Sequence, residues 1–283
     1  MSTSHHHQFG GEGGHFVLPE PIRLKSFGDD PWSVAGRNLL NLHLKPGPIL
    51  SWSPGKDYGR ALEQFKRDLI AKQVANRKAQ GQVAILGLPE SELVHLTANP
   101  KQKMRKDVAK VFEEMWTAMN TERAALPEVS KSVSVGVASA YRDAKRDAIA
   151  WNNAFDGKYY RATLDERLAT GDEFGSKALD LIFHFMNGKK APPGFSGHTH
   201  GIAADLTTTE NGRVWTVNSD VGHQRGWQTT WLYKWLVGKA GKYKFYQLQT
   251  ETWHWEFHEG EPPLNTVYGG RATVSERRIK KSK

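Results

Sequence analysis

Residues 195–205 read FSGHTHGIAAD and gather potential metal ligands around a glycine. His198 and Asp205 are separated by six residues, and Gly201 lies between them, where a residue without a Cβ lets the chain bend. Ligands on the two arms of such a bend can face one ion. An imidazole nitrogen with a carboxylate oxygen suits zinc better than calcium or magnesium, and a catalytic zinc needs a third protein ligand.

The best candidate for the third ligand lies about fifty residues further on, in residues 250–257, which read TETWHWEF. His254 lies in an aromatic run that is typical of a buried strand, and Glu251 precedes it by three residues. On a regular strand these two side chains point in opposite directions, so we expect Glu251 on a loop or bulge before the strand. Glu256 points the same way as His254 and is a rival catalytic base.

His200 is an alternative ligand within the first segment. On a strand it points the same way as His198, so a His-x-His pair can replace the pair of His198 and Asp205. A single histidine near apolar residues is more often an ordinary core or surface residue than a ligand. The convergence of several features favours a metal site, but spacing alone leaves its ligands open.

The two segments carry a family resemblance. The run Ser196, His198, Gly201, Ala203 and Asp205 resembles the Ser-x-His-x-x-Gly-x-Ala-x-Asp signature of a group of zinc peptidases, and Glu251 to His254 resembles their Glu-x-x-His signature. The group includes lysostaphin-type enzymes, D-alanyl-D-alanine carboxypeptidases and murein endopeptidases, and the chain is most similar to its D,D-carboxypeptidase and D-alanyl-D-alanine dipeptidase branch. The resemblance implies zinc bound by His198, Asp205 and His254, with Glu251 as the catalytic base and His200 not a ligand. Glu256 is then a partner of a ligand.

A further motif follows the strand expected at residues 133–138. By composition alone Arg142 is a surface charge, but Ser139, Tyr141 and Arg142 resemble the Ser-x-Tyr-Arg sequence that follows this strand in the family. The resemblance implies that Arg142 reaches the zinc site and holds a substrate carboxylate or stabilises the developing oxyanion. Ser139, Tyr141 and Ser196 are the further substrate-binding candidates.

Length and periodicity define the expected architecture. The 283 residues, 38% hydrophobic with ten tryptophans, allow one sizeable domain or a core domain with a helical addition. We predict helices at 57–80, 102–123, 143–153, 176–187 and 229–237, strands at 133–138, 244–248 and 250–257, and two strand-like runs around a turn at 210–212. The predicted class is α+β: a small antiparallel sheet carrying the zinc site, flanked by helices, with a mainly helical N-terminal extension. The predicted divisions are a flexible tail (1–21), a helical or irregular extension (22–100), the zinc peptidase catalytic domain (101–258) and a basic flexible tail (259–283).

Charge and composition limit the partners. The formal charge of +9 and the ending RRIKKSK favour anionic surfaces such as wall polymers, although such a tail can equally serve solubility. No nucleic-acid module accompanies the basic residues, and no apolar run is long enough to span a bilayer. The opening residues lack the pattern of a secretory signal. We therefore expect a protein made in the cytoplasm that acts at the bacterial cell wall after release, as a phage-type lysin, or after delivery by an injection apparatus.

The predicted function follows from the resemblance. It implies a zinc metallopeptidase that hydrolyses peptidoglycan stem peptides at the D-Ala-D-Ala end, as a D,D-carboxypeptidase or endopeptidase. The alternatives are a cytoplasmic D-alanyl-D-alanine dipeptidase and a non-catalytic wall-binding module. Glu251 argues against the last, because a protein that only binds has no need of a base beside the third ligand.

Overall fold

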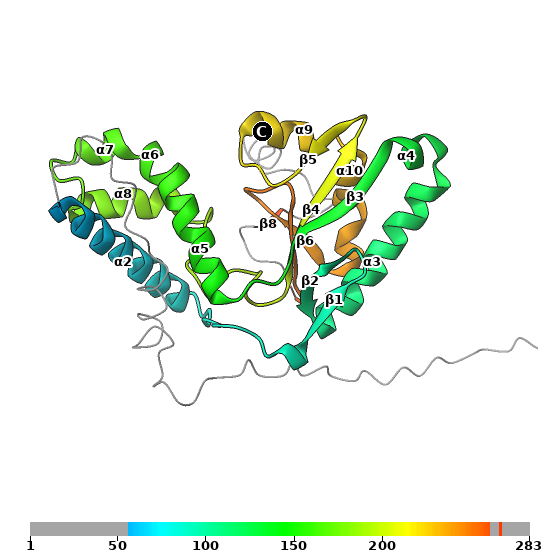
Figure 1. The fold of residues 1–283 in the computed structure, drawn as a ribbon, viewed down its shortest axis with the longest axis horizontal. Coiled ribbons are helices and arrows are strands. Elements are labelled where there is room, and N and C mark those ends of the chain that lie inside the picture. Colours follow the sequence, from blue (N-terminus) through cyan, green and yellow to red (C-terminus); the bar gives the residue numbers. More distant parts are fainter. Residues whose placement is uncertain (1–55, 261–265, 268–283) are drawn as a thin grey trace, which may run out of the picture.

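The structure, a computed structural model, describes residues 56–260 and 266–267. Figure 1 shows two groups of elements side by side, which we name the helical lobe and the sheet lobe. The helical lobe contains α2 (Lys56–Ala79), α5 (Ala144–Ala154), η2 (Phe155–Tyr159), α6 (Tyr160–Ala162), α7 (Leu164–Leu168) and α8 (Ser176–Met186). The sheet lobe contains η1 (Glu90–Glu92), β1 (Leu93–Leu96), β2 (Asn99–Arg105), α3 (Lys106–Ala125), α4 (Pro127–Ser132), β3 (Val133–Ser139), β4 (Ala203–Glu210), β5 (Arg213–Trp215), α9 (Val221–Trp227), α10 (Trp231–Lys239), η3 (Ala240–Tyr243), β6 (Phe245–Leu248), β7 (His254–Phe257) and β8 (Thr266–Val267).

The sheet of the sheet lobe is antiparallel throughout. Its strand order is β3-β4-β7-β6-β8, with β5 paired to the far end of β4. The central strand β4 is therefore hydrogen-bonded to both β3 and β7. This small antiparallel sheet, flanked by helices, confirms the predicted α+β class.

Helix α3 packs against the sheet through large side chains. The rings of Phe112 and Phe245 meet edge to face with centroids 5.7 Å apart, and Phe245 meets Phe257 in the same way at 5.8 Å. Trp255 on β7 is 1% exposed and lies in the same core cluster. Full burial of each such side chain contributes roughly 1.5–3 kcal/mol, so this core fixes the position of β7 and of the residues beside it.

The predicted helix at 102–123 is wrong at its start. Residues Asn99–Arg105 form β2, which pairs with β1 in an antiparallel hairpin, and α3 begins only at Lys106. Met104 is fully buried between more exposed neighbours, as expected of a strand with one face against the core. The strand was not predicted because the helical periodicity of the residues that follow it extends over the whole segment.

Most other predicted elements are confirmed to within a few residues. The strands observed as β3, β4, β5 and β6 match, as do the helices observed as α2, α5 and α8. Helix α10 does not end at Gly238 but runs to Lys239, and Thr230 caps its start by accepting a hydrogen bond from the Tyr233 N–H. The strand predicted at 250–257 is shorter, because β7 begins at His254. The tail at 1–21 and most of the tail at 259–283 lie outside the described residues.

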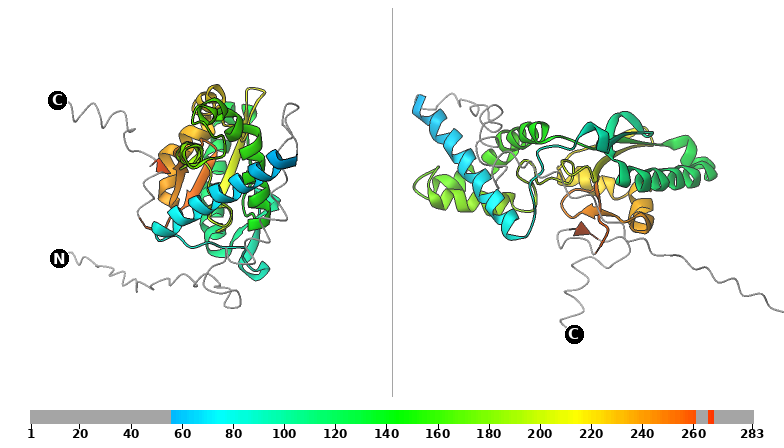
Figure 2. Two further views of the ribbon diagram at one scale, coloured as in Figure 1. Left: turned by 90° about the vertical axis from the view of Figure 1, so that its left-hand side faces the viewer. Right: turned by 90° about the horizontal axis from the view of Figure 1, so that it is seen from below.

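The helical lobe has its own core, to which α2 contributes one face. Leu62, Phe65 and Leu69 of α2 are almost fully buried in a cluster with Trp151 and Ile182. Figure 2, with the helical lobe toward the viewer, shows α2 running diagonally across it. This face of the helix thus packs on residues that lie far along the chain from it.

The segment between α2 and β1 follows the junction of the two lobes. The backbone N–H of Ile85 donates to Gly194 O, that of Ala144 donates to Leu86 O, and that of Leu88 donates to the Tyr141 hydroxyl. These bonds fix the C-terminal end of α2 beside the loop that precedes β4. Among the residues described, none of the helices has both the length and the apolar character needed to cross a membrane.

Candidate metal centre

Three neighbouring strands bring polar side chains into one row. Asp205 on β4 lies opposite His254 on β7 and opposite Ser139 at the end of β3. Directly opposed residues of antiparallel strands project from the same face of the sheet. The sheet therefore aligns the predicted second and third ligands without any contribution from the loops.

The loop before β4 carries His198 to the same place. Gly201 has φ +68°, and a Cβ at this position would lie 3.2 Å from the backbone nitrogen of Arg105 and 2.8 Å from Leu88. Both the left-handed backbone and the close approach favour glycine. The bend predicted at Gly201 is confirmed, and it turns His198 back over the start of β4.

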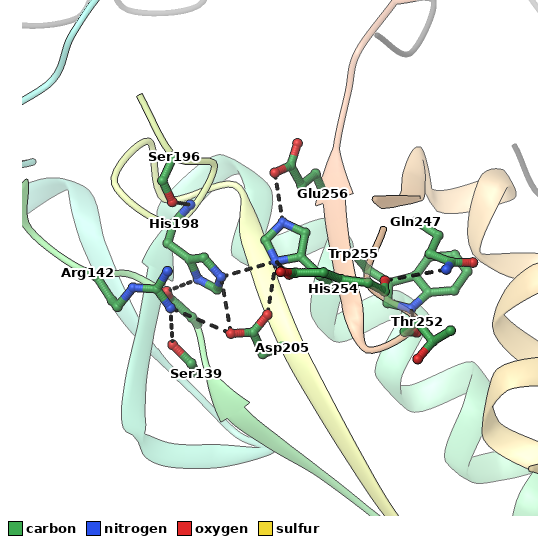
Figure 3. A network of polar contacts seen from close by, with 12 residues as sticks. Ser139, Arg142, Ser196, His198, Asp205, Gln247, Thr252, His254, Trp255 and Glu256 are labelled. Atoms are coloured by element: carbon green, nitrogen blue, oxygen red, sulfur yellow. Dashed lines mark hydrogen bonds and ion pairs between the residues drawn. The ribbon is translucent and has the colours of Figure 1, made fainter. Parts of the chain in front are cut away.

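The orientation of the His198 ring is set by a backbone carbonyl. Its Nδ1 lies 2.5 Å from Ala140 O, so Nδ1 carries the proton and donates it. Its Nε2 then presents a lone pair, 3.2 Å from Asp205 Oδ2 and 3.2 Å from His254 Nδ1. His254 Nδ1 in turn lies 2.9 Å from Asp205 Oδ1. Figure 3 shows the three side chains converging from the loop, β4 and β7.

This group fits zinc. The three candidate ligand atoms lie within 4.8 Å of one another, and His198, Asp205 and His254 are all buried. Two imidazole nitrogens and one carboxylate oxygen match the three-ligand shells of catalytic zinc sites, which leave a fourth position open. An all-oxygen shell, as calcium or magnesium needs, does not form from these donors.

Electrostatics within the group favour a cation. Burial acts to raise the pKa of Asp205, but His198 and His254 outweigh it and hold that pKa well below its usual value. Burial likewise acts to lower the pKa of His254, yet its hydrogen bonds to Asp205 and Glu256 raise it to about 10. Burial lowers the pKa of His198, with Asp205 opposing. A metal ion that binds to these three side chains would take the place of the proton on His254, so its binding would release a proton.

His200 lies apart from this group. Its Nε2 is 3.2 Å from the backbone carbonyl of Gly194, and it is not among the residues whose donor atoms converge. Gly201 breaks the extended geometry on which the His-x-His alternative depends, because residues 198–201 form a turn and not a strand.

Glu251 lies before β7, as expected, because on a regular strand its side chain would point away from that of His254. One of its carboxylate oxygens is 3.9 Å from His254 Nδ1, the nitrogen that faces Asp205. Burial raises the pKa of Glu251, although the neighbouring His254 opposes this shift. A carboxylate with a raised pKa beside the open side of a metal centre can accept and return a proton.

Glu256 lies on the other side of the same ring. Its Oε1 accepts a hydrogen bond of 2.7 Å from His254 Nε2, and its Oε2 is 3.3 Å from His258 Nε2. Burial would raise the pKa of Glu256, but the hydrogen bonds from both histidines lower it far below the ordinary value. Glu256 therefore contacts the back of His254, away from the converging donors.

Arg142 is held at the edge of the centre by three groups. It donates from one terminal nitrogen to Ser139 Oγ at 2.9 Å, and that nitrogen is 3.5 Å from Asp205 Oδ2. The other terminal nitrogen is 3.5 Å from Asp147 Oδ1. Its Nε is buried without a hydrogen-bond partner within the described part of the chain. The contacts of the terminal nitrogens thus fix the guanidinium at the edge of the cavity, which Arg142 lines.

The remaining predicted residues differ in position. Ser196 lines the cavity at the centre, and its Oγ accepts from the His198 N–H at 3.2 Å. Ser139 accepts from Arg142, whereas the Tyr141 hydroxyl accepts from the Leu88 N–H at 2.8 Å. Of the three, only Ser196 is among the residues that line the cavity.

A cavity of about 470 Å³ opens over the centre between the two lobes. Its walls include side chains of both lobes: Arg77, Arg142, Asp147, Lys189, Lys190, His198, Asp205, Glu251, Trp253, His254 and Glu256. A second cavity of about 510 Å³ adjoins it and shares Lys189, Lys190, Val217, Glu251 and Trp253. Glu251 therefore lines both cavities.

Asp147 is a site residue that the sequence analysis did not single out. It is 1% exposed, and Thr199 Oγ1 donates to its Oδ2 at 3.3 Å. It thus joins Arg142 to the loop that carries His198. The available signal was an acid in the first turn of the helix that follows Arg142, where Asp143 already serves as the cap.

Comparison with known proteins gives the family. The family model for VanY, D-alanyl-D-alanine carboxypeptidase, matches residues 101–260, which is more than half of the chain. No curated protein sequence matches the chain.

Three similar solved structures are carboxypeptidases or related peptidases. The LdcB LD-carboxypeptidase, whose structure concerns peptidoglycan recognition, is 18% identical with a TM-score of 0.37, over 60% of this chain and 69% of that chain. VanYB in complex with D-alanine-D-alanine is 16% identical with a TM-score of 0.35, over 62% and 84% of the two chains. A vancomycin resistance D,D-pentapeptidase VanY in complex with Zn(II) is 16% identical with a TM-score of 0.33, over 62% and 86%. The assignment rests on the family model: this chain belongs to the VanY family of D-alanyl-D-alanine carboxypeptidases.

Proposed function

We propose that this protein is a zinc-dependent D,D-carboxypeptidase that removes the terminal D-alanine from stem peptides of peptidoglycan. One observation carries the proposal: the donor atoms of His198, Asp205 and His254 lie within 4.8 Å of one another, in the same cavity as Glu251 and Arg142. A ligand triad, a base and a fixed cation are the parts that metal-assisted hydrolysis of a peptide bond requires.

His198, Asp205 and His254 are the proposed zinc ligands. His198 offers Nε2, because its Nδ1 donates to Ala140 O, and His254 offers Nδ1, because its Nε2 donates to Glu256. Zinc bound by these atoms supplies a Lewis acid that polarises a carbonyl and lowers the pKa of water to about 7.

Glu251 is the proposed catalytic base. It lies 3.9 Å from His254 Nδ1 and lines both cavities, so a water and a scissile peptide can reach its carboxylate together. It takes the proton of the attacking water and then gives it to the nitrogen of the leaving D-alanine. Glu256 is unsuited to this role, because its carboxylate is occupied by His254 and His258.

Arg142 is the proposed anchor for the substrate. Arg142 lines the cavity, and its permanent charge suits the terminal carboxylate of the peptide or the oxyanion that forms during attack. Ser139 supports this role by holding the guanidinium, and Ser196 lies where it can contact the peptide. Substrate binding by Tyr141 stays a prediction, since its hydroxyl is engaged by Leu88.

The test is product analysis by mass spectrometry. Zinc-loaded protein is incubated with purified sacculi and, separately, with the dipeptide D-Ala-D-Ala, with a chelator control for each. Chelator-sensitive loss of one terminal D-alanine from stem peptides is the expected result. Cleavage of the dipeptide alone would instead support a dipeptidase, and binding to sacculi without any product would support a wall-binding module.

The second cavity favours one alternative, an endopeptidase. A carboxypeptidase needs room for a single residue beyond the scissile bond, whereas Glu251 also lines a second cavity of about 510 Å³. Cleaved cross-links in the same sacculus digest would identify this activity. The route to the wall, as a phage-type lysin or an injected effector, stays a prediction from the sequence.

A further inference from the structure

Three basic residues of one wall face the candidate metal centre. Arg77 lies in the last turn of α2, and Lys189 and Lys190 follow α8; all three line the cavity that holds the centre. Each is partly buried, unlike a solvated surface charge. Lys189 and Lys190 also line the second cavity, so they lie where the two cavities join.

Within the described ranges, none of these three side chains has a carboxylate within 4.0 Å, although several other cations of the helical lobe do. Lys66 pairs with Asp156 at 2.6 Å, and Lys72 pairs with Asp180. Lys189 instead lies over the ring of Phe185, with Nζ 3.8 Å from its centroid. A partly buried cation with no acid in direct contact is electrostatically complementary to an anion from outside.

Three acids of the cavity are already engaged, whereas the fourth, Glu251, lies close enough for the charge of Lys190 to oppose the rise that burial causes in its pKa. Asp205 contacts His198 and His254, Glu256 contacts His254 and His258, and Asp147 contacts Arg142. Burial lowers the pKa of Arg77, and the charge of Glu256 opposes that shift, which places the guanidinium within electrostatic reach of the centre.

Hydrogen bonds hold Lys189 and Lys190 beside α2, the helix that carries Arg77. The side-chain amide of Gln73 on α2 donates from Nε2 to Lys190 O at 3.2 Å, which ties the segment after α8 to α2. Gly188, with φ +77°, turns the chain so that the N–H groups of Lys189 and Lys190 both donate to Met186 O. Arg77 comes from outside residues 101–260, so the wall includes a part of this chain that the family match does not cover.

We propose that Arg77, Lys189 and Lys190 form an anion subsite that binds a carboxylate carried along the peptide substrate, separate from the terminal carboxylate assigned to Arg142. The enzyme then selects peptides whose side groups are free carboxylates over the same peptides with those groups amidated. This inference rests on the proposed peptidase function, since it names the substrate class of that same cavity.

The test uses two synthetic peptides that both end in D-Ala-D-Ala and differ in one group. In one, the residue before this end carries a side carboxylate; in the other, that group is a primary amide. The ratio of kcat/KM for the two peptides is the readout. Because a charge-assisted hydrogen bond is stronger than a neutral one, we expect the carboxylate peptide to be preferred by about tenfold at low salt, and less at high salt.

Variants assign the preference to these residues. Arg77→Gln, Lys189→Gln and Lys190→Gln are each expected to lower the ratio, and the triple variant to bring it near one. Lys177→Gln is the matched control, because Lys177 is an exposed lysine of α8 that lines neither cavity. Equal rates for the two peptides, or a ratio that the triple variant leaves unchanged, would overturn the inference.

A binding measurement separates this inference from the proposed function. Both peptides are titrated calorimetrically into the zinc-loaded Glu251→Gln variant, with and without the triple substitution. If neither peptide is cleaved by the wild type but the carboxylate peptide binds about tenfold tighter, the subsite stands and the proposed reaction fails. If both are cleaved and both bind equally, the reaction stands and the subsite fails.

Discussion

Glu256 accepts a 2.7 Å hydrogen bond from His254 Nε2, while Asp205 lies 2.9 Å from Nδ1 of the same ring. The two carboxylates thus hold opposite edges of one imidazole. In the proposed ligand set, Glu256 orients the ring, increases its basicity and leaves Nδ1 for zinc.

The first prediction concerns this support. Glu256→Gln keeps an acceptor for Nε2–H but removes the charge, so zinc affinity should fall about 10- to 100-fold. Competition with a chromophoric chelator measures it. Glu259→Gln is the control, because Glu259 is exposed and pairs with Lys244 at 3.9 Å, away from His254. Unchanged affinity in Glu256→Gln would remove the supporting role.

The second prediction separates the rival bases. Glu251→Gln should retain zinc and lose about 10²- to 10⁴-fold in kcat, because the amide cannot accept the proton of water. Glu256→Gln should show the reverse pattern, with weakened zinc binding and turnover that excess zinc largely restores. Zinc content by atomic absorption and kcat at saturating substrate are measured for both. Normal turnover of Glu251→Gln would exclude Glu251 as the base.

The third prediction concerns the ligand set. His254→Ala should lose both bound zinc and activity, because only two of the three donors remain. His200→Ala should keep both, since the His200 ring contacts the Gly194 carbonyl and not the centre. Metal analysis after exhaustive dialysis distinguishes them. A variant at position 200 that lost zinc while His254→Ala retained it would reverse the assignment.

The fourth prediction concerns Arg142. Arg142→Ala should keep zinc but lower kcat/KM by about 100-fold, as loss of one preorganised donor at the oxyanion or carboxylate typically does. Arg142→Lys should recover only part of this loss, because an ammonium cannot contact Ser139, Asp147 and the substrate together. Arg146→Ala, at an exposed position one turn along, is the control. An unchanged rate would return Arg142 to the role of a surface charge.

Local chemistry explains which parts of the site were predictable from sequence. Gly201 signalled a bend because only glycine readily adopts the left-handed backbone found there, and strand parity required Glu251 to lie before β7. Both inferences depend on residues close in the chain. The choice between His200 and Asp205 did not follow from spacing and came only with the family resemblance.

Contacts between distant segments explain what was missed. The stripe on α2 predicted a buried face, but nothing in residues 56–79 identifies Trp151 and Ile182 as its partners. For the same reason nothing in this helix identifies Arg77 as a residue that lines the cavity. The β1–β2 hairpin was missed because its short strands alternate only weakly and run directly into the strong helical pattern of α3.

The last prediction tests whether α2 is part of the folded core or a separable extension, as the boundary predicted at residue 100 implies. Leu69 is fully buried against the helical lobe, so Leu69→Ala should lower the free energy of unfolding by about 2–5 kcal/mol. Leu168→Ala makes the same chemical change at a residue 49% exposed in the same lobe, and should cost only about 0.5 kcal/mol. Chemical denaturation of both variants, at fixed zinc concentration, gives the comparison. If Leu69→Ala is as mild as Leu168→Ala, α2 contributes nothing to the core, and its end cannot hold Arg77 rigidly at the cavity. A large and cooperative loss would instead mean that the anion subsite and the core of the helical lobe depend on the same helix.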